Sequence, residues 1–118
     1  MLNRPTVASY TEDSVSGTTA NAYADALDVD TRGVKSISME LANTDGANSL
    51  TWQLRCRYAD HAAGTDEEIA EAPGEDVLTF GTKGLVTLLR GYSRIKVQVK
   101  STVGDAHATY TLNYLINR

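Results

Sequence analysis

The stretch Leu50-Thr51-Trp52-Gln53-Leu54-Arg55-Cys56-Arg57-Tyr58 decides the fold class, because its even positions are apolar or aromatic and its odd positions are polar or charged. In a β-strand successive side chains point to opposite faces, so this alternation predicts a strand with one buried face. The pattern returns in residues 35–42, 93–101 and 107–116. Strands with one wet face are typical of antiparallel sheets, and we therefore expect an all-β protein.

Turn-forming residues separate the expected strands. Apart from Gly17 and Gly64, every glycine falls in a gap between two of these strands, where a positive φ costs least. The expected strands cover roughly residues 23–29, 35–42, 49–60, 76–80, 85–89, 93–101 and 107–116. Two sheets of such strands packed face to face form an antiparallel β-sandwich or jelly roll of about seven to eight strands, with a small barrel as the alternative.

Two segments depart from the alternating pattern. Residues 1–20 are rich in Ser, Thr and Ala, and we expect an extended N-terminal arm or a poorly paired edge, followed by a single β-sandwich domain over residues 21–118. Residues 65–72 contain early acids and good helix formers, which permits one or two helical turns in a long loop. No stretch approaches the roughly 20 apolar residues that span a bilayer, and the N-terminus has no signal-peptide pattern. We expect a protein that is made in a cytoplasm and does not enter a membrane.

Residue types that carry catalysis or bind zinc are few. His61 and His107 are the only histidines, and acids close to both in sequence could orient an imidazole. A nucleophile is missing, however, because the serines and threonines lie in ordinary strand and turn contexts. Cys56, the only cysteine, belongs to an alternating apolar series and is expected to be a buried small hydrophobe. The sequence therefore predicts no catalytic residue, no metal ligand, no cofactor and no enzymatic activity.

Two oxygen-rich segments raise the question of calcium. Seven acidic residues and no basic one lie between Asp60 and Asp76, but their spacing lacks the alternate-position pattern and the central glycine of an EF-hand. Asn43, Asp45 and Asn48 form a smaller group around one glycine. We expect a solvated loop and an ordinary turn, respectively. Whether the acidic loop over residues 60–76 binds a cation stays open at this point.

Basic residues recur on the polar faces of two expected strands. They are Arg55, Arg57, Arg94, Lys96 and Lys100. If the two strands are neighbours, these side chains form a positive stripe, and we hypothesise that the stripe faces an acidic partner surface. Nucleic acid is not the expected partner, because the aromatic residues alternate onto the buried faces and the sequence pI is about 5.0.

Three stretches resemble a known class of proteins. They are Val34-Lys35-Ser36-Ile37-Ser38-Met39-Glu40-Leu41-Ala42-Asn43-Thr44, Asn48-Ser49-Leu50-Thr51-Trp52-Gln53-Leu54 and Tyr92-Ser93-Arg94-Ile95-Lys96-Val97-Gln98-Val99-Lys100-Ser101-Thr102. A strand that ends in an Asn-Thr turn, a strand that begins Asn-Ser-Leu and a late alternation of basic and apolar residues are similar to small β-rich virion proteins of tailed bacteriophages. These include capsid decoration, or cement, proteins.

This resemblance spans roughly residues 23–116 and carries implications for function. It implies a non-enzymatic protein that self-associates, often as a trimer, binds the lattice of the major capsid protein and reaches a neighbour with a terminal arm. The implied location is the virion, after synthesis in the host cytoplasm. No contact residue of that class matches a particular position in this sequence. The alternative is a carbohydrate- or cell-surface-binding β-sandwich module, for instance in a phage tail, although Trp52 is expected to be buried and unable to serve as a sugar platform.

Overall fold

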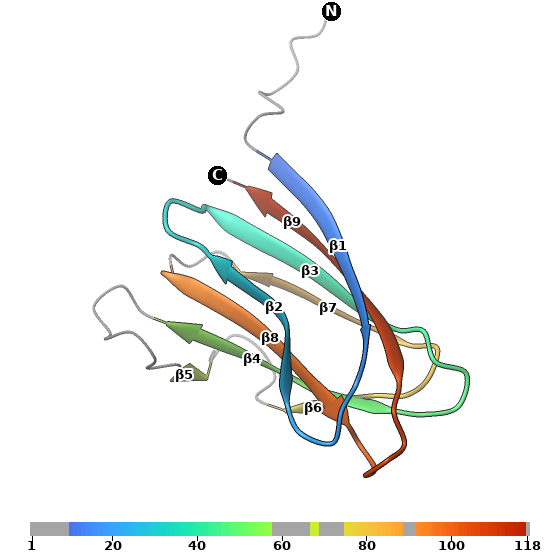
Figure 1. Cartoon of the computed structure of the whole chain (residues 1–118). Helices are drawn as coiled ribbons and strands as arrows, with labels where there is room; N and C mark the ends of the chain where they lie inside the picture. Colours follow the sequence, from blue (N-terminus) through green and yellow to red (C-terminus); the bar gives the residue numbers. More distant parts are fainter. Residues whose placement is uncertain (1–9, 58–66, 69–74, 89–91, 118) are drawn as a thin grey trace, which may run out of the picture.

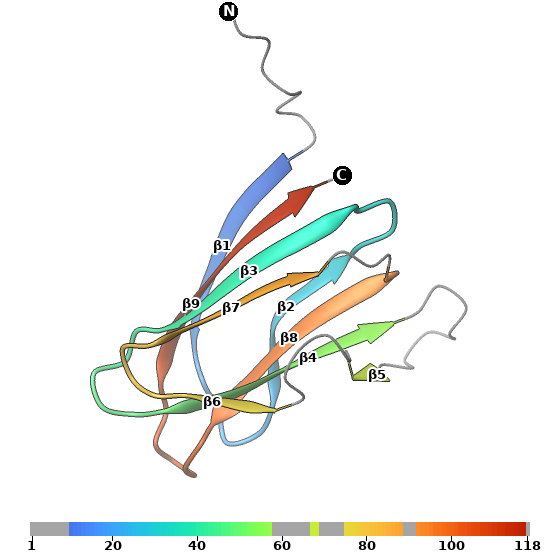
Figure 2. The ribbon, with the colours of Figure 1, turned by 180° about the vertical axis from the view of Figure 1, so that it is seen from behind.

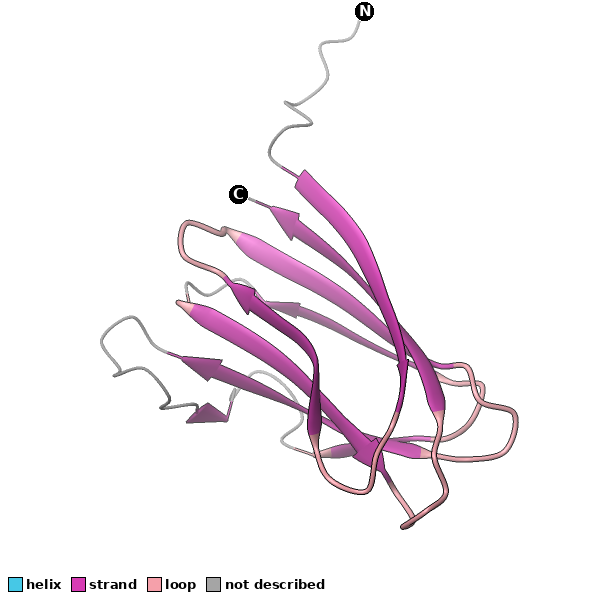
Figure 3. Cartoon of the chain, in the orientation of Figure 1, coloured by secondary structure: helices cyan, strands magenta, loops and turns pink. Residues whose placement is uncertain are grey.

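The computed structural model describes residues 10–57, 67–68, 75–88 and 92–117, and every structural statement below concerns these residues. They form nine strands and no helix (Figure 3). The strands are β1 (Tyr10–Thr18), β2 (Ala24–Asp30), β3 (Ser36–Asn43), β4 (Leu50–Arg57), β5 (Glu67–Glu68), β6 (Asp76–Leu78), β7 (Lys83–Leu88), β8 (Arg94–Ser101) and β9 (Thr109–Asn117). In this part of the chain there is accordingly no helix that could cross a membrane.

The strands form two antiparallel sheets that face each other (Figures 1 and 2). A four-stranded sheet has the order β1-β9-β3-β7, and a five-stranded sheet has the order β2-β8-β4-β5 with β6 also paired to β4. The first strand pairs with the last, β2 with β8, β3 with β7, and β4 with β6. This is the connectivity of one long antiparallel hairpin wound into two sheets, which is a jelly roll. The all-β sandwich or jelly roll predicted from the sequence is confirmed, and the barrel alternative is not observed.

One core fills the space between the sheets. Burial alternates strictly along β3 and β8, and nearly so along β4, as the sequence pattern predicted. The four-stranded sheet contributes Ile37, Leu41 and Leu112, and the five-stranded sheet contributes Leu54 and other side chains that are almost completely buried. Each fully buried Leu or Ile side chain stabilises the fold by about 1.5–3 kcal/mol relative to its exposed state. The two inner faces therefore depend on each other.

The N-terminal segment differs from the extended arm expected over residues 1–20. Residues 10–18 form β1, and all nine of them pair with β9 from Tyr10 opposite Asn117 to Thr18 opposite Thr109. The sequence signal for this strand is weak because its inward positions are Asp13, Val15 and Gly17, of which only Val15 is a sizeable apolar residue. Residues 1–9 lie outside the described part of the chain.

A close packing contact explains the glycine within β1. A Cβ atom added to Gly17 would lie 2.7 Å from the hydroxyl oxygen of Tyr110 on β9, so a larger residue here would force a shift. Glycine thus lets the edge strand approach an aromatic side chain, and it weakens the alternation that sequence analysis depends on. Residues 10–18 thus form an edge strand, but a fully paired one and not the poorly paired edge that was the other option for residues 1–20.

Smaller corrections concern the middle of the chain. Within residues 65–72, the two described residues, Glu67 and Glu68, form the short strand β5 opposite Cys56 and Arg55, not a helical turn. The other residues of that segment, and most of the acidic loop over residues 60–76, lie outside the described part of the chain. β7 begins at Lys83, two residues earlier than predicted, because Gly81 already completes the turn at φ 74°.

Candidate interaction surfaces

The outer face of the five-stranded sheet brings the predicted basic residues together. β4 and β8 are neighbours, and their register places Arg55 opposite Lys96 and Arg57 opposite Arg94. Lys100 lies further along β8, opposite Thr51. All five basic side chains are half-buried on the outward face, which alternates with the buried inward positions of the same strands. The juxtaposition is a structural fact, whereas the binding of a partner by these residues stays a hypothesis.

An acidic column on β2 flanks this basic stripe. Asp28 lies opposite Lys96 and Asp30 lies opposite Arg94, and the Arg94 Nε donates to Asp28 Oδ1 at 2.5 Å. Asp25 adds to the column, because its carboxylate accepts a hydrogen bond from Gln98 Nε2 at 2.9 Å. Part of the positive charge is thus complemented within the sheet itself, which reduces the charge left for an external acidic partner.

A β-bulge creates this acidic column. The register of β2 against β8 shifts between Asp25 and Leu27, so Asp25 and Asp28 both face outward although they are three residues apart. In a regular strand, residues three apart face opposite sides. The sequence alternation alone would have turned one of the two carboxylates inward, so the cluster could not be read from the pattern. The bulge is also a device that discourages β2 from pairing with another strand.

The ends of this face carry two further polar contacts. Arg32 forms an ion pair with Asp30 at 2.5 Å, and these hydrogen bonds lower the pKa of Asp30 to about 2. At the other end, the Tyr23 hydroxyl donates to Glu75 Oε2 at 2.7 Å, and Lys100 Nζ lies 4.7 Å from the centre of the Tyr23 ring. Burial and then the hydrogen bond to Glu75 raise the pKa of Tyr23. Lys100 is therefore held partly by a cation–π contact.

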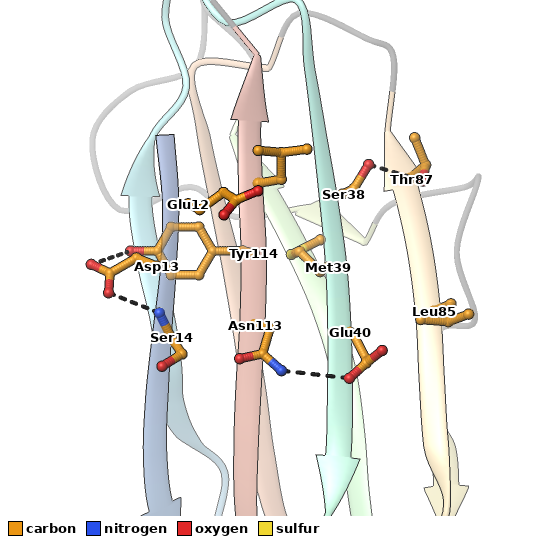
Figure 4. Close-up of a pocket in the computed structure, with 11 residues that line it drawn as sticks. Glu12, Asp13, Ser14, Ser38, Met39, Glu40, Leu85, Thr87, Asn113 and Tyr114 are labelled. Atoms are coloured by element: carbon orange, nitrogen blue, oxygen red, sulfur yellow. Dashed lines mark hydrogen bonds between the residues drawn. The ribbon is translucent and has the colours of Figure 1, made fainter. Parts of the chain in front are cut away.

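The outer face of the four-stranded sheet is different in chemistry. It carries an open groove of about 660 Å³ that crosses β1, β9, β3 and β7. Figure 4 shows its polar side chains, with Asn113 Nδ2 3.5 Å from Glu40 Oε1 and the Ser38 hydroxyl 3.2 Å from that of Thr87. Leu85 lies at the β7 side of the groove with 73% of its surface exposed. Hydroxyl and amide groups that donate and accept hydrogen bonds thus dominate this face.

The turn suspected of binding a cation has an internal role. The Asp45 carboxylate accepts the backbone N–H groups of Asn48 at 2.8 Å and Ala47 at 3.0 Å. These hydrogen bonds lower the pKa of Asp45. Asn43, which is 2% exposed, donates to the carbonyl oxygens of Asn48 and Leu78. The oxygens are engaged with the chain's own backbone, which supports the predicted turn.

A serine and a histidine that sequence analysis did not connect lie in contact. Ser101 Oγ is 2.9 Å from His107 Nδ1, and it is also 2.8 Å from Thr19 Oγ1. Thr19 Oγ1 in turn accepts the backbone N–H of Ala108 at 2.8 Å. Because Ser101 and Thr19 are each 4% exposed, the serine hydroxyl is buried between its partners, and the cluster ties the strand ends together. His61, the other candidate histidine, lies outside the described residues.

The two side chains expected in the core are there. Cys56 is 1% exposed, as a small buried hydrophobe should be. Trp52 is 4% exposed and packs so closely that a Cβ atom added to Gly84 would lie 3.0 Å from its ring. Among the described residues no group of three or more His, Cys, Asp or Glu side chains could hold a metal ion.

Comparisons with known proteins identify the fold. No protein-family model and no curated protein matches the chain. A chain described with Bacillus endospore appendages that form disulfide-linked pili has a TM-score of 0.56 and 16% identity, and the match covers 92% of this chain and 86% of that chain. PirA matches with a TM-score of 0.56 and 16% identity over 90% of this chain and 93% of that chain.

Two further matches complete this picture. The Yersinia pseudotuberculosis-derived mitogen has a TM-score of 0.54 and 12% identity over 88% of this chain and 84% of that chain. A protein of the infectious bursal disease virus particle reaches only a TM-score of 0.44 and is covered over 31% of its length, so that likeness carries no argument. At these identities the matches show the β-sandwich fold alone, and they do not identify the virion proteins that the sequence resembles.

Proposed function

We propose that this chain is a non-enzymatic structural component of a protein assembly, of the capsid decoration type that binds the coat-protein lattice of a virion. The observation that carries the proposal is the arrangement of the polar side chains outside the core. On both sheets they form rows across the strands, as in the row of Asp30, Arg94 and Arg57, and the Ser101 hydroxyl that contacts His107 is itself buried. Broad rows of this kind suit repeated protein contacts.

The fold supports this role without specifying the assembly. A sandwich whose five-stranded sheet ends in short or bulged strands can be displayed in many copies, each of which contributes a weak contact, and avidity then supplies stability. That a chain of the same fold is described with bacterial pili fits a role in assembly. The proposed partners are the major capsid protein and further copies of this chain, which would form trimers in the manner of decoration proteins.

The test of this role is a count of copies. Quantitative mass spectrometry of virus particles purified from the source should find this chain in a simple ratio to the major coat protein. A few copies per particle would indicate a tail or neck component and would contradict decoration of the lattice. Complete absence from particles would overturn the virion role.

The basic stripe provides a test of the contact surface. In the proposal, Arg55 and Lys96 face an acidic patch on the partner, so the double variant Arg55→Glu/Lys96→Glu should weaken association and flatten its dependence on salt. The control is Lys35→Glu, which alters an exposed lysine away from the stripe. Binding by the double variant equal to that of the control would exclude the stripe as the contact surface, provided that both variants remain folded.

The groove on the four-stranded sheet favours a second candidate function, the binding of a carbohydrate. Hydroxyl, amide and carboxylate groups such as those of Ser38, Asn113 and Glu40 are suited to sugar hydroxyls. A glycan that occupies the groove should raise the melting temperature of the native chain, and it should raise that of Asn113→Ala by less. Failure of a broad set of glycans to shift the melting temperature would remove this candidate.

A further inference from the structure

We propose that the two open edges of the four-stranded sheet, β1 and β7, pair with each other in neighbouring copies of this chain, so that the sheet continues head to tail from one copy to the next. This inference deepens the proposed function and rests on it, because it specifies the self-association. It follows from the direction, hydrogen-bonding pattern, charge and exposure of the two edges.

Strand direction makes the two edges complementary. Successive strands in the order β1-β9-β3-β7 are antiparallel, so the first and the fourth run in opposite directions. Figure 1 shows β1 and β7 at opposite edges of this sheet. When a second copy is placed beside the first in the same orientation, β7 of one copy lies antiparallel to β1 of the next. The outer faces of the two sheets then point to the same side.

The hydrogen-bonding pattern of β1 leaves alternate residues available. Thr19 N donates to Ala108 O, and the register of β1 against β9 continues this pairing without a shift. Residues of odd number in β1 therefore bond to β9, and residues of even number direct their N–H and C=O groups to the open edge. These are Glu12, Ser14, Ser16 and Thr18, with the backbone of Tyr10 at the end. The Ser14 N–H is met only by the neighbouring Asp13 carboxylate at 2.8 Å, a contact that an incoming strand would replace.

The same reasoning applies to β7. Asn43 N donates to Thr82 O, and the register of β3 against β7 continues this pairing through Gly84 and Val86. Lys83, Leu85 and Thr87 then direct their backbone groups to the open edge. Their side chains lie on the outer face of the sheet, as do those of the edge-facing residues of β1. When the edge-facing backbone groups of β7 bond to those of β1, the side chains of the paired residues therefore lie on the same face of the sheet.

Charge and exposure favour this pairing over two alternatives. β1 contains Glu12 and Asp13 and no basic residue, whereas β7 contains Lys83 and no acid. Pairing of β1 with a second β1 would gather four carboxylates, and pairing of β7 with a second β7 would gather two ammonium groups. Among the residues whose burial the structure describes, Leu85 is the most exposed large apolar side chain at 73%, and a strand beside β7 would cover part of it.

The remaining edges of the sandwich are less suited to pairing. β2 is interrupted by its bulge and carries outward aspartates such as Asp28 and Asp30. β5 and β6 contain two and three residues, respectively. By contrast, β1 has nine residues without a register shift. Head-to-tail pairing is a heterologous contact, so the copies close into a ring or extend as a filament according to the rotation between them.

Proline variants test the pairing because proline removes a backbone N–H. At Ser16 and at Leu85 that N–H faces the open edge, so Ser16→Pro and Leu85→Pro should block pairing without removing a backbone hydrogen bond within the sheet. The purified full chain should sediment as oligomers in analytical ultracentrifugation, and each proline variant alone should sediment as a monomer. The control Lys35→Ser, at an exposed position outside both edge strands, should associate like the native chain. Cooperative thermal unfolding of each variant will show that it is folded.

The decisive measurement is a mixture of the two proline variants. Ser16→Pro retains an intact β7 and Leu85→Pro retains an intact β1, so an equimolar mixture should form dimers that grow no further. Dimers of Leu85→Pro alone would show pairing of β1 with β1 and would overturn the proposal, and so would a native chain that stays monomeric at its highest soluble concentration. These measurements use the purified chain alone, so they test the pairing of β1 with β7 independently of the virion role. The copy count in virus particles tests the virion role, and either proposal can be refuted while the other stands.

Discussion

The outer faces of the two sheets differ in how their polar groups are satisfied. On the five-stranded sheet, charged side chains stand in adjacent columns of opposite sign, and Asp28 on the edge strand contacts Arg94 on its neighbour. On the four-stranded sheet, uncharged groups dominate, and contacts such as that between Ser16 and Thr111 join neighbouring strands. The first face satisfies its charges laterally and ends in a bulged edge, whereas the second ends in two regular edges. The face with less charge is thus the one that another copy can extend.

The largest expected effects are losses of stability in core variants, which test whether the two sheets differ only in their outer faces and share one core. Leu54 and Leu112 are 1% and 0% exposed and come from opposite sheets. Because both belong to one core, Leu54→Ala and Leu112→Ala should each lower the free energy of unfolding by about 2–5 kcal/mol. Chemical denaturation should show one cooperative transition for each variant. Two separate transitions for Leu112→Ala would show that the sheets are independent units.

A second prediction concerns the attachment of the open edge β7 to the core. The Cβ atom of Gly84→Ala would lie 3.0 Å from Trp52 Cζ2, so the indole ring has to shift in a packed interior. We expect a loss of about 1–3 kcal/mol in the free energy of unfolding. Gly46→Ala is the matched control, because nothing lies within 4 Å of its added Cβ atom. Equal stability of the two variants would show that β7 can move away from the core at little cost.

A smaller effect compares the two outer faces directly. The side chains of Arg94 and Asp28 are 36% and 33% exposed, so solvent screens their ion pair. Asp28→Ala should lower the free energy of unfolding by at most about 1 kcal/mol, and the loss should shrink at high salt. Ser38→Ala on the other face should cost less and should not depend on salt. A salt-independent loss in Asp28→Ala would contradict the lateral pairing of charges.

The smallest expected effect lies in the turn that connects the two sheets between β3 and β4. Hydrogen bonds from Asn48 and Ala47 lower the pKa of Asp45 from the ordinary value of 3.8, so the ionised form stabilises the folded protein. This stabilisation is complete above about pH 4 and is lost as the pH falls through the lowered pKa. The difference in melting temperature between the native chain and Asp45→Asn should therefore narrow with acidification. A constant difference from neutral to acidic pH would exclude ionisation of Asp45 as its cause.

The sequence was sufficient for the parts of the fold in which side chains alternate. Both ends of β3 and β8 and the start of β4 were predicted to within one residue of their described bounds, because each strand has buried apolar residues at every second position. Residues 10–18 were predicted to belong to an arm or a poorly paired edge, because Asp13 and Gly17 occupy inward positions of β1 and weaken its alternation. The order of the strands in the sheets could not be obtained, since pairing between the ends of a chain leaves no local signal.

The candidate surfaces were predictable only in part. The alternation of polar and apolar residues predicted that Arg55 and Lys96 lie on outward faces. That their strands are neighbours is known only from the structure. The acidic column beside them depends on the bulge at Asp25–Leu27, which one sequence does not reveal. The groove of the four-stranded sheet was missed for a different reason, because it combines residues from four strands that are distant in sequence.

The pairing of the first strand with the last has a consequence for biosynthesis. Tyr10 pairs with Asn117, so the four-stranded sheet cannot close until the chain through residue 117 has left the ribosome. Until then β9 is missing between β1 and β3, and both strands expose unpaired backbone groups. Such non-local β topologies fold in milliseconds to seconds, which is slow for a chain of this size. The four-stranded sheet therefore forms only after β9 has been synthesised, and the interval before β9 emerges is when a nascent chain is most exposed to aggregation or capture by a chaperone.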